Sequence, residues 1–377
     1  MGTRPEAIKL APVADALRRR GIEPFLLFTG QHPLKPADYG LEGYRFADLR
    51  CRGGGDPHAH AYAVATAAAP MLGGTALLVV QGDTSSALGA TYAGSVARVH
   101  VAHVEAGLRS HDRNRPWPEE DFRIEIDRVA QLLFAPTDLS AANLRRERVR
   151  GSIYVTGNSG IDAVLGVRPA QTPKYKPPRE RPRVLVTCHR RESWGAGITG
   201  IAGALRTVAE QKIASIDLLL HPNPATAAHM RALLLGCDGI AIQQPLGHRQ
   251  AVAAMLDADC VLSDSGGIQE ECAALGIPLL VLRERTERPE GIACGTMELV
   301  GIEPNLIVQA LRRACRQRLG GSRPAAGSPY GDGRASDRIA TIIADRLAPG
   351  PPTVVECDQP PLKTFQGPVM ASVRPGP

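Results

Sequence analysis

Aromatic residues and paired cysteines are scarce in this chain. Phe, Trp and Tyr make up 4% of its 377 residues, so the core must rest on Ala, Val, Leu and Ile. The eight cysteines form no CxxC pair and show no metal-ligand spacing, which argues against a bound metal. Several stand in apolar runs, where cysteine behaves as a small hydrophobic residue. We therefore expect reduced thiols and a cytoplasmic protein.

The sequence also lacks a signal peptide, an apolar run of membrane length and a clustered basic face. The first two absences predict a soluble chain without a membrane partner. The formal charge of +6 permits an acidic ligand, but 38 carboxylates are mixed among the 44 basic residues. A nucleic-acid-binding surface usually gathers its basic and aromatic residues, so this balance argues against nucleic acid. It suits a phosphorylated small molecule.

Short apolar runs alternate with helical stretches along most of the chain. They cover residues 25–29, 76–83, 99–105, 132–137 and 153–158, and then 183–189, 217–224, 240–242, 260–265 and 278–283. Near-continuous apolar strands separated by helices predict an α/β fold with parallel sheets covered on both faces. Polar residues stand where these strands end, including His32, Asp83, Glu105 and His189. In such folds ligands bind at that carboxyl edge of the sheet.

The two series of strands predict two doubly wound, Rossmann-like domains with a ligand in the cleft between them. We place the N-terminal domain at 1–170 and the linker, which is rich in proline, at 171–182. The C-terminal domain then spans 183–330, and a last helix over 335–347 is expected to join the N-terminal domain. Residues 348–377 are Pro-rich without periodicity, which predicts a disordered tail.

The beginning of the chain is unusual for this type of fold. Residues 1–12 look like a glycine turn that opens a helix running to about Arg20, with Gly21 as its stop. Such a turn normally follows a buried strand. We therefore expect the first strand of the sheet to be absent, for instance through a start codon placed too late, and the protein made from Met1 to be destabilised.

The stretch DSGGIQEE at 264–271 follows an apolar run and reads as a strand, a glycine turn and the first turn of a helix. Gly266 and Gly267 leave the backbone amides open, and the helix start favours negative charge. The octapeptide therefore fits a phosphate-binding turn. It fits an ordinary Ser-Gly turn that caps a helix equally well.

Three carboxylates stand at consecutive strand ends or helix starts: Asp83, Glu105 and Glu119. Singly, each suits a cap, a turn or a favourable first-turn charge. Together they indicate proton transfer, because carboxylates in one cleft push one another's pKa values apart and so supply both an acid and a base. His189, beside two arginines, is either a further such group or a phosphate or structural contact.

Nine motifs in order carry a resemblance to a known family: GTRPEAIKLAPV, TGQH, QGDTSS, HVEAGLRS, PWPEE, HRRESWG, DSGGIQEE, TERPE and SPYGDG. Over residues 1 to about 347 the chain resembles the non-hydrolysing bacterial UDP-N-acetylglucosamine 2-epimerases. The resemblance implies a fold of glycosyltransferase-B type, a homodimer, and interconversion of UDP-GlcNAc and UDP-ManNAc. The reaction would eliminate UDP to a 2-acetamidoglucal and add it back, with no redox cofactor.

The resemblance also implies roles for residues. Asp83, Glu105 and Glu119 would transfer protons, with His189 near the departing diphosphate. The implied substrate-binding residues are Arg4 and Lys9 for the diphosphate, Ser265, Gly266 and Gly267 for phosphate, Glu271 for the ribose, Arg288 at the nucleotide, and His32, whose neighbourhood in many relatives forms a second, activating UDP-GlcNAc site.

Two departures from the family pattern stand out. Phe122 occupies a position where the family usually has Asn, which predicts altered hydrogen bonds beside Arg123. Ala251 stands where an aromatic residue commonly packs on the uracil. Three alternatives remain open: an epimerase that releases ManNAc and UDP by hydrolysis, a glycosyltransferase of similar fold, and a degenerate nucleotide-sugar-binding protein.

Overall fold

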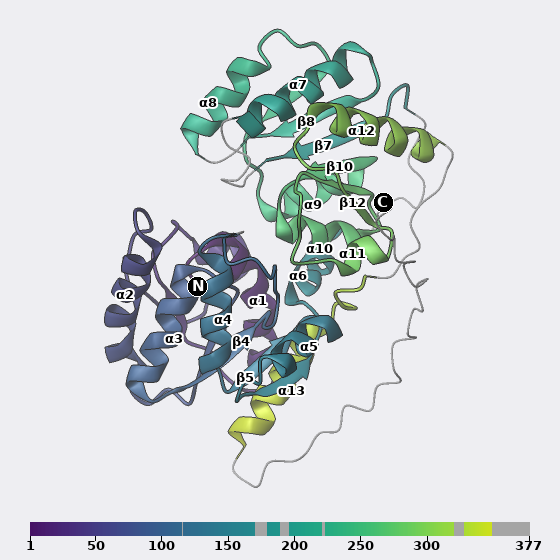
Figure 1. Cartoon of the computed structure of the whole chain (residues 1–377). Helices are drawn as coiled ribbons and strands as arrows, with labels where there is room; N and C mark the ends of the chain where they lie inside the picture. The colour runs from purple at the N-terminus through teal and green to yellow at the C-terminus, as the bar shows by residue number, and fades with distance from the viewer. Residues whose placement is uncertain (115, 170–178, 189–195, 221–222, 320–327, 349–377) are drawn as a thin grey trace, which may run out of the picture.

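The computed structural model describes residues 1–348 except 115, 170–178, 189–195, 221–222 and 320–327. It contains two Rossmann-like domains, each built on parallel strands with helices on both sides (Figure 1). This confirms the α/β fold class predicted from the alternating apolar runs. His189, most of the predicted linker and nearly all of the predicted tail lie outside the described residues.

The N-terminal domain carries strands β1 to β6. Its elements are α1 (Arg4–Arg18), β1 (Leu26–Phe28), η1 (Pro36–Tyr39), β2 (Phe46–Asp48), α2 (Pro57–Ala68), η2 (Ala69–Leu72), β3 (Leu77–Gln81), α3 (Ser85–Ala97), β4 (His100–Val104), α4 (Glu119–Val129), β5 (Leu132–Ala135), α5 (Asp138–Arg146), β6 (Ser152–Val155) and α6 (Ser159–Val167). Strands β3, β4, β5 and β6 form one parallel sheet in that order, and β1 and β2 form a separate two-stranded parallel sheet.

The C-terminal domain has a single six-stranded parallel sheet in the order β12-β11-β10-β7-β8-β9. Its elements are β7 (Arg183–Thr187), α7 (Ala196–Glu210), β8 (Ser215–Leu219), α8 (Pro224–Leu233), β9 (Ile240–Gln243), α9 (His248–Asp257), β10 (Cys260–Ser263), α10 (Gly266–Leu275), β11 (Leu279–Val281), α11 (Glu290–Ala293), β12 (Met297–Leu299) and α12 (Pro304–Leu319). Successive residues of β10 enter opposite apolar clusters, Val261 with α9 and Leu262 with α7, because side chains alternate along a strand.

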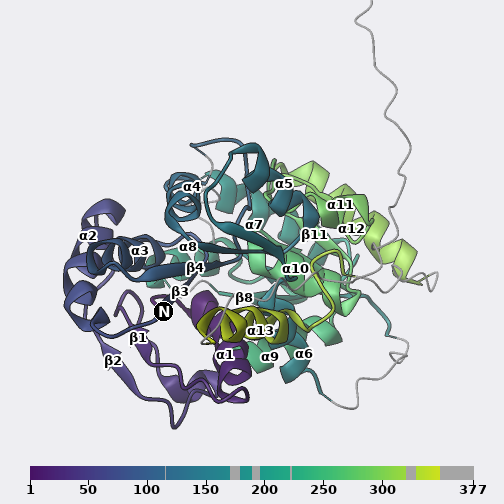
Figure 2. The same cartoon turned by 90° about the horizontal axis from the view of Figure 1, so that it is seen from below.

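The first residue lies at the break between the two sheets of the N-terminal domain (Figure 2). The amino group of Met1 donates to the Leu27 carbonyl oxygen at 2.8 Å, and the Thr29 N–H donates to Met1 O at 2.9 Å. The Met1 side chain packs into the apolar cluster that includes Leu77 and Val79 of β3. Burial lowers the pKa of this amino group, and Glu6 partly offsets the effect. The absent strand predicted here stays a prediction.

Helix α13 (Ala335–Leu347) returns to the N-terminal domain and packs against α1 (Figures 1 and 2). Ile339 and Ile343 are buried in the same cluster as Leu10, Val13 and Leu17. The contact is amphipathic, because the apolar residues of both helices recur at helical spacing. The last described helix therefore completes one face of the first domain.

Candidate active site

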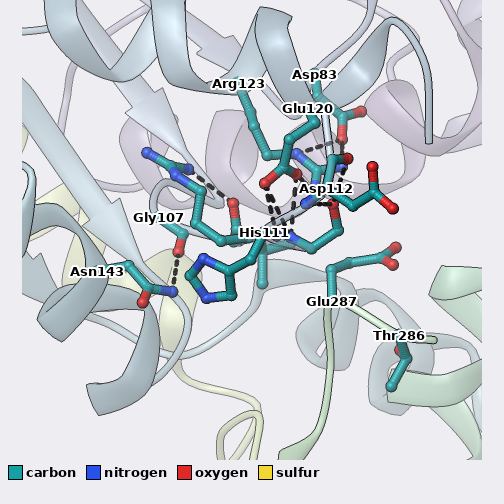
Figure 3. A network of polar contacts seen from close by, with 12 residues as sticks. Asp83, Gly107, His111, Asp112, Glu120, Arg123, Asn143, Thr286 and Glu287 are labelled. Carbon is teal, nitrogen blue, oxygen red and sulfur yellow. Dashed lines mark hydrogen bonds and ion pairs between the residues drawn. The ribbon is translucent and has the colours of Figure 1, made fainter. Parts of the chain in front are cut away.

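Asp83 follows strand β3 and is held by Arg123 of helix α4 (Figure 3). Arg123 Nε donates to Asp83 Oδ2 at 3.1 Å, and Nη2 donates to the same oxygen. Arg123 Nη1 donates to Glu120 Oε2 at 2.9 Å. The Arg123 side chain is 4% exposed and the Asp83 side chain 29%, so the carboxylate reaches solvent while its partner is buried.

The two glutamates of the PWPEE motif have different surroundings. Glu120 is buried and accepts from the backbone N–H groups of Ser110 and His111 at 3.0 Å, so it fixes the loop that follows β4 (Figure 3). Glu119, the first residue of α4, is only partly buried. Glu120 therefore holds the loop in place, and Glu119 remains the candidate for proton transfer.

Phe122 does not disturb this arrangement. Its side chain is buried in the core of the N-terminal domain, where the ring meets the ring of His58 edge to face at 5.0 Å between centroids. Arg123, the next residue, donates to Asp83 and Glu120. Phe122 thus makes an apolar contact, and the altered hydrogen bonds predicted beside Arg123 stay a prediction.

Glu105 follows β4 with an unusual backbone conformation. Its φ is +71°, in the left-handed region, which costs a residue with a side chain roughly 1–3 kcal/mol and is typical of functional sites. The N–H groups of Glu105 and Ala106 both donate to the Phe134 carbonyl oxygen, at 3.1 and 3.0 Å. The turn aims the buried Glu105 carboxylate at Lys9.

Lys9, Glu105, Arg288 and Glu270 form a closed ring of alternating charges. Lys9 Nζ donates to Glu105 Oε2 at 2.6 Å and to Glu270 Oε2 at 3.0 Å. Arg288 Nη2 donates to Glu105 Oε1 at 2.9 Å, and Arg288 Nε donates to Glu270 Oε1 at 2.5 Å. The N-terminal domain supplies Lys9 and Glu105, and the C-terminal domain supplies the other two. We call this set the four-charge ring.

All four members of the ring are buried, with exposed fractions between 1% and 8%. Burial alone would favour the neutral amine, but the carboxylates of Glu105 and Glu270 raise the pKa of Lys9 above its usual value. Gln81 Nε2 also donates to Glu105, and Glu287 accepts from Arg288. The contact between the two domains therefore contains buried ion pairs.

A second buried network lies beneath the strand ends that carry Asp83 and Glu105. His103 Nδ1 lies 2.7 Å from Asp127 Oδ1, and His103 Nε2 lies 2.9 Å from the Gly82 carbonyl oxygen. Asp127 Oδ2 accepts from Gly107 N–H at 3.1 Å and from Arg109 Nη2 at 2.8 Å. This network ties the residue before Asp83, the turn after Glu105 and helix α4 to one another.

Helix α10 begins at Gly266, directly after strand β10 and Ser265. A Cβ on Gly266 would lie 2.6 Å from Arg288 Nη1, so any larger residue here would force the Arg288 side chain to shift. A Cβ on Gly267 would meet no atom within 4 Å, which leaves space in front of the helix start. One turn later, Glu271 Oε1 lies 3.3 Å from His248 Nε2 at the start of α9.

Two further contacts join the domains near this edge. Arg4 Nη2 donates to the Leu246 carbonyl oxygen at 2.5 Å, before α9. Arg285 Nη1 lies 3.5 Å from Asp112 Oδ2, which belongs to the loop anchored by Glu120. Figure 3 shows Glu287 of the C-terminal domain beside this loop.

His32 follows β1 with an exposed side chain, and its N–H donates to the Gly2 carbonyl oxygen at 2.9 Å.

Some members of the site were not singled out from the sequence. They are Gln81, His103, Glu120, Asp127, Glu270 and Glu287. His103 and Glu270 lie inside the motifs HVEAGLRS and DSGGIQEE, so motif membership was the available signal. Their partners are 24 and 261 residues away in the chain, and no local pattern indicates such pairings.

Within the described ranges no group of three His, Cys, Asp or Glu side chains is arranged to hold a metal ion. None of the helices in this part of the chain is long and apolar enough to cross a membrane.

Two Rossmann-like domains whose polar strand ends meet across a shared site define an α/β enzyme of glycosyltransferase-B type. The family model described as UDP-N-acetylglucosamine 2-epimerase matches residues 15–344. A UDP-N-acetylglucosamine 2-epimerase of Yersinia pestis is 37% identical over 375 residues, covering 91% of this chain and 96% of the relative. The chain belongs to the UDP-N-acetylglucosamine 2-epimerase family.

Solved structures agree with this assignment. The structure of a UDP-N-acetylglucosamine 2-epimerase homologue from Listeria monocytogenes matches with a TM-score of 0.84 at 30% identity, covering 94% of this chain and 96% of that one. The UDP-GlcNAc 2-epimerase from Neisseria meningitidis, bound to UDP-GlcNAc, matches with a TM-score of 0.81 at 31% identity, covering 91% and 98%. The resemblance inferred from the nine motifs is confirmed at the level of the family.

Proposed function

We propose that this chain interconverts UDP-GlcNAc and UDP-ManNAc by eliminating UDP and adding it back, without net hydrolysis. The observation that carries the proposal is the placement of Asp83 and Glu105 at one sheet edge, opposite the glycine start of α10 in the other domain. A carboxylate pair suits proton transfer at a weakly acidic carbon, and a helix start suits a departing diphosphate. Family membership and the relative solved with UDP-GlcNAc support the choice of substrate.

In this proposal the substrate lies with its nucleotide on the C-terminal domain. The amides at Ser265, Gly266 and Gly267 bind phosphate, where the empty space before Gly267 leaves room for it. Glu271 accepts from the ribose hydroxyls, and Arg288 lies at the nucleotide. Arg4 and Lys9, at the start of α1, favour the charge that grows on the diphosphate as it leaves.

The chemistry then falls to the N-terminal domain. One carboxylate among Asp83, Glu105 and Glu119 takes the proton from the sugar carbon that bears the acetamido group while the bond from the anomeric carbon to UDP breaks. The product is 2-acetamidoglucal. Another of these groups returns a proton to the opposite face as UDP adds back, so no redox cofactor is consumed. His189 is assigned to the diphosphate by its motif.

We also propose a cytoplasmic homodimer. Tyr92 and Val96, four residues apart on α3, share a helix face and are 37% and 75% exposed, and Tyr62 on the neighbouring α2 is 75% exposed. These apolar side chains support a second copy of the chain as the partner. Sedimentation at micromolar concentration tests this, and a monomer that stays monomeric as the concentration rises contradicts it.

The test of the reaction follows UDP-GlcNAc in deuterated water by proton NMR. We expect UDP-ManNAc that carries deuterium at the acetamido-bearing carbon, because the abstracted proton exchanges with solvent. Free ManNAc with UDP would identify the hydrolysing reaction instead. Substrate that binds but stays unchanged would contradict an enzymatic role. The same incubation without protein is the control for exchange by the buffer.

A further inference from the structure

Glu270 has no role in the proposed reaction, although it contacts both of the cations that hold Glu105. It neighbours Glu271 in the DSGGIQEE motif, but its side chain is only 2% exposed and is therefore too buried to contact a ligand. Both of its oxygens are occupied, one by Lys9 Nζ at 3.0 Å and one by Arg288 Nε at 2.5 Å. These two cations are the same ones that hold Glu105.

The geometry of the four-charge ring constrains Glu105 from two sides. Lys9 lies on the Oε2 side of Glu105 and Arg288 on the Oε1 side, so the plane of the carboxylate is fixed by both. Each cation is in turn fixed by an oxygen of Glu270. A carboxylate whose partners are themselves held stays in one orientation, and misplacement of a reacting group by about 1 Å can cost about 100-fold in rate.

The ring also depends on the two domains being closed. Glu270 and Arg288 belong to the C-terminal domain, whereas Lys9 and Glu105 belong to the N-terminal domain. If the domains part, Glu105 loses Arg288 and Lys9 loses Glu270 together. The orientation of Glu105 is therefore complete only in the closed arrangement.

We propose that Glu270 is a positioning residue, which holds Lys9 and Arg288 against Glu105 and so makes the proton-transfer geometry depend on domain closure. The inference rests on the proposed epimerase function and adds to it a residue that does not touch the substrate. Without the Glu270 charge, Lys9 and Arg288 would be two cations facing the single carboxylate of Glu105, with Glu287 remaining on Arg288. Their mutual repulsion would turn them away from the positions seen here.

The test compares Glu270→Gln with the matched control Glu298→Gln, whose wild-type side chain pairs with Arg313 on the surface. Epimerisation and UDP affinity are measured for both, the latter by calorimetry. We expect Glu270→Gln to lower kcat about 10- to 100-fold and to raise the Kd for UDP by a clearly smaller factor, because Lys9 and Arg288 also lie at the proposed nucleotide site, whereas the orientation of Glu105 acts only on the chemical step. Glu298→Gln should match the wild type in both.

Two further variants separate positioning from loss of folding. Glu270→Asp keeps the charge and should recover part of the lost kcat. Lys9→Met combined with Glu270→Gln should lose less kcat than the product of the two single losses, because Glu270 acts in part through Lys9. Losses that multiply, a UDP affinity that falls in proportion to kcat, or a kcat within twofold of the wild type would each overturn the inference. A wild type without epimerisation would instead overturn the proposed function on which it rests.

Discussion

The two domains of this protein share a fold type but differ in the arrangement of their sheets, apolar clusters and buried polar networks. In the C-terminal domain one sheet of six strands separates two apolar clusters, one on each face. In the N-terminal domain the described strands form two sheets, and the apolar residues fall into several clusters beside the buried network of His103, Asp127 and Arg109. The domain that carries the proposed chemistry therefore has a charged network directly beneath the strand ends that bear Asp83 and Glu105.

This contrast fits the tasks proposed for the two domains. Binding a nucleotide requires a rigid helix start with space in front of it, and a continuous sheet supplies that. Proton transfer requires carboxylates held in defined orientations, which only directional contacts can do. Substitutions in each domain test whether the two domains have these separate tasks.

The largest effect is expected for Glu105→Gln. The amide keeps the shape of the side chain but cannot accept a proton as a carboxylate does, so solvent exchange at the sugar should fall by about 10²- to 10⁴-fold. UDP affinity should stay nearly unchanged, since the nucleotide is proposed to lie on the other domain. The NMR exchange assay and calorimetry measure the two quantities. Full exchange in this variant would remove Glu105 from the proton-transfer residues.

Asp127→Asn is expected to destabilise the N-terminal domain. Burial tends to raise the pKa of Asp127, but His103 and Arg109 outweigh it and lower the pKa below its ordinary 3.8. A lowered folded-state pKa means that the carboxylate stabilises the fold above about pH 4 and loses this effect as pH falls through the folded value. Removing one partner of such a buried pair costs about 3–5 kcal/mol.

Denaturant titration across pH measures this effect. The variant should lose most stability at neutral pH and progressively less as pH falls below about 4, so its stability should depend less on pH than that of the wild type. Glu125→Gln, at an exposed pair with Arg128, is the matched control and should change stability by less than about 0.5 kcal/mol. An equal loss at pH 3 and pH 7 would contradict the ionic explanation.

A smaller effect is expected from a pair of glycine substitutions in the C-terminal domain. Gly266→Ala places a methyl group against Arg288 and should cost about 1–3 kcal/mol of stability, because a guanidinium held by three carboxylates has little room to move. Gly267→Ala meets no atom and should leave stability unchanged or raise it by up to about 1 kcal/mol. Thermal unfolding measures both.

The same pair tests phosphate binding. If the helix start binds the diphosphate, the methyl group of Gly267→Ala occupies the space in front of the amides, so this variant should bind UDP more weakly although it is fully stable. Unchanged UDP affinity in Gly267→Ala would place the diphosphate elsewhere.

Much of the fold could be predicted from the sequence, because apolar periodicity is local. All ten predicted strand regions contain strands, and the predicted helix 335–347 coincides with α13. Strands β2 and β12 were missed because each contains a charged residue, Asp48 in β2 and Glu298 in β12, so neither forms a continuous apolar run. Strands β1 and β11 are equally short, but their residues are all apolar and stand out in the sequence.

The site was predictable only in part, for the same reason. Strand ends placed Asp83 and Glu105 at one edge, because parallel strands share an edge. The partners that orient them come from distant segments: Arg123 is 40 residues from Asp83, and Arg288 is 183 residues from Glu105. Such pairings follow from tertiary packing. His189 and the other predicted binding roles stay predictions.

The position of α13 bears on how this protein is made. Leu10, Val13 and Leu17 of α1 emerge from the ribosome first, yet the residues that cover them, Ile339 and Ile343, are among the last described. Translation at roughly 5–20 residues per second leaves this face of α1 exposed to water or to chaperones for tens of seconds. The N-terminal domain is therefore translated first, but its apolar cluster is complete only after α13 has been made.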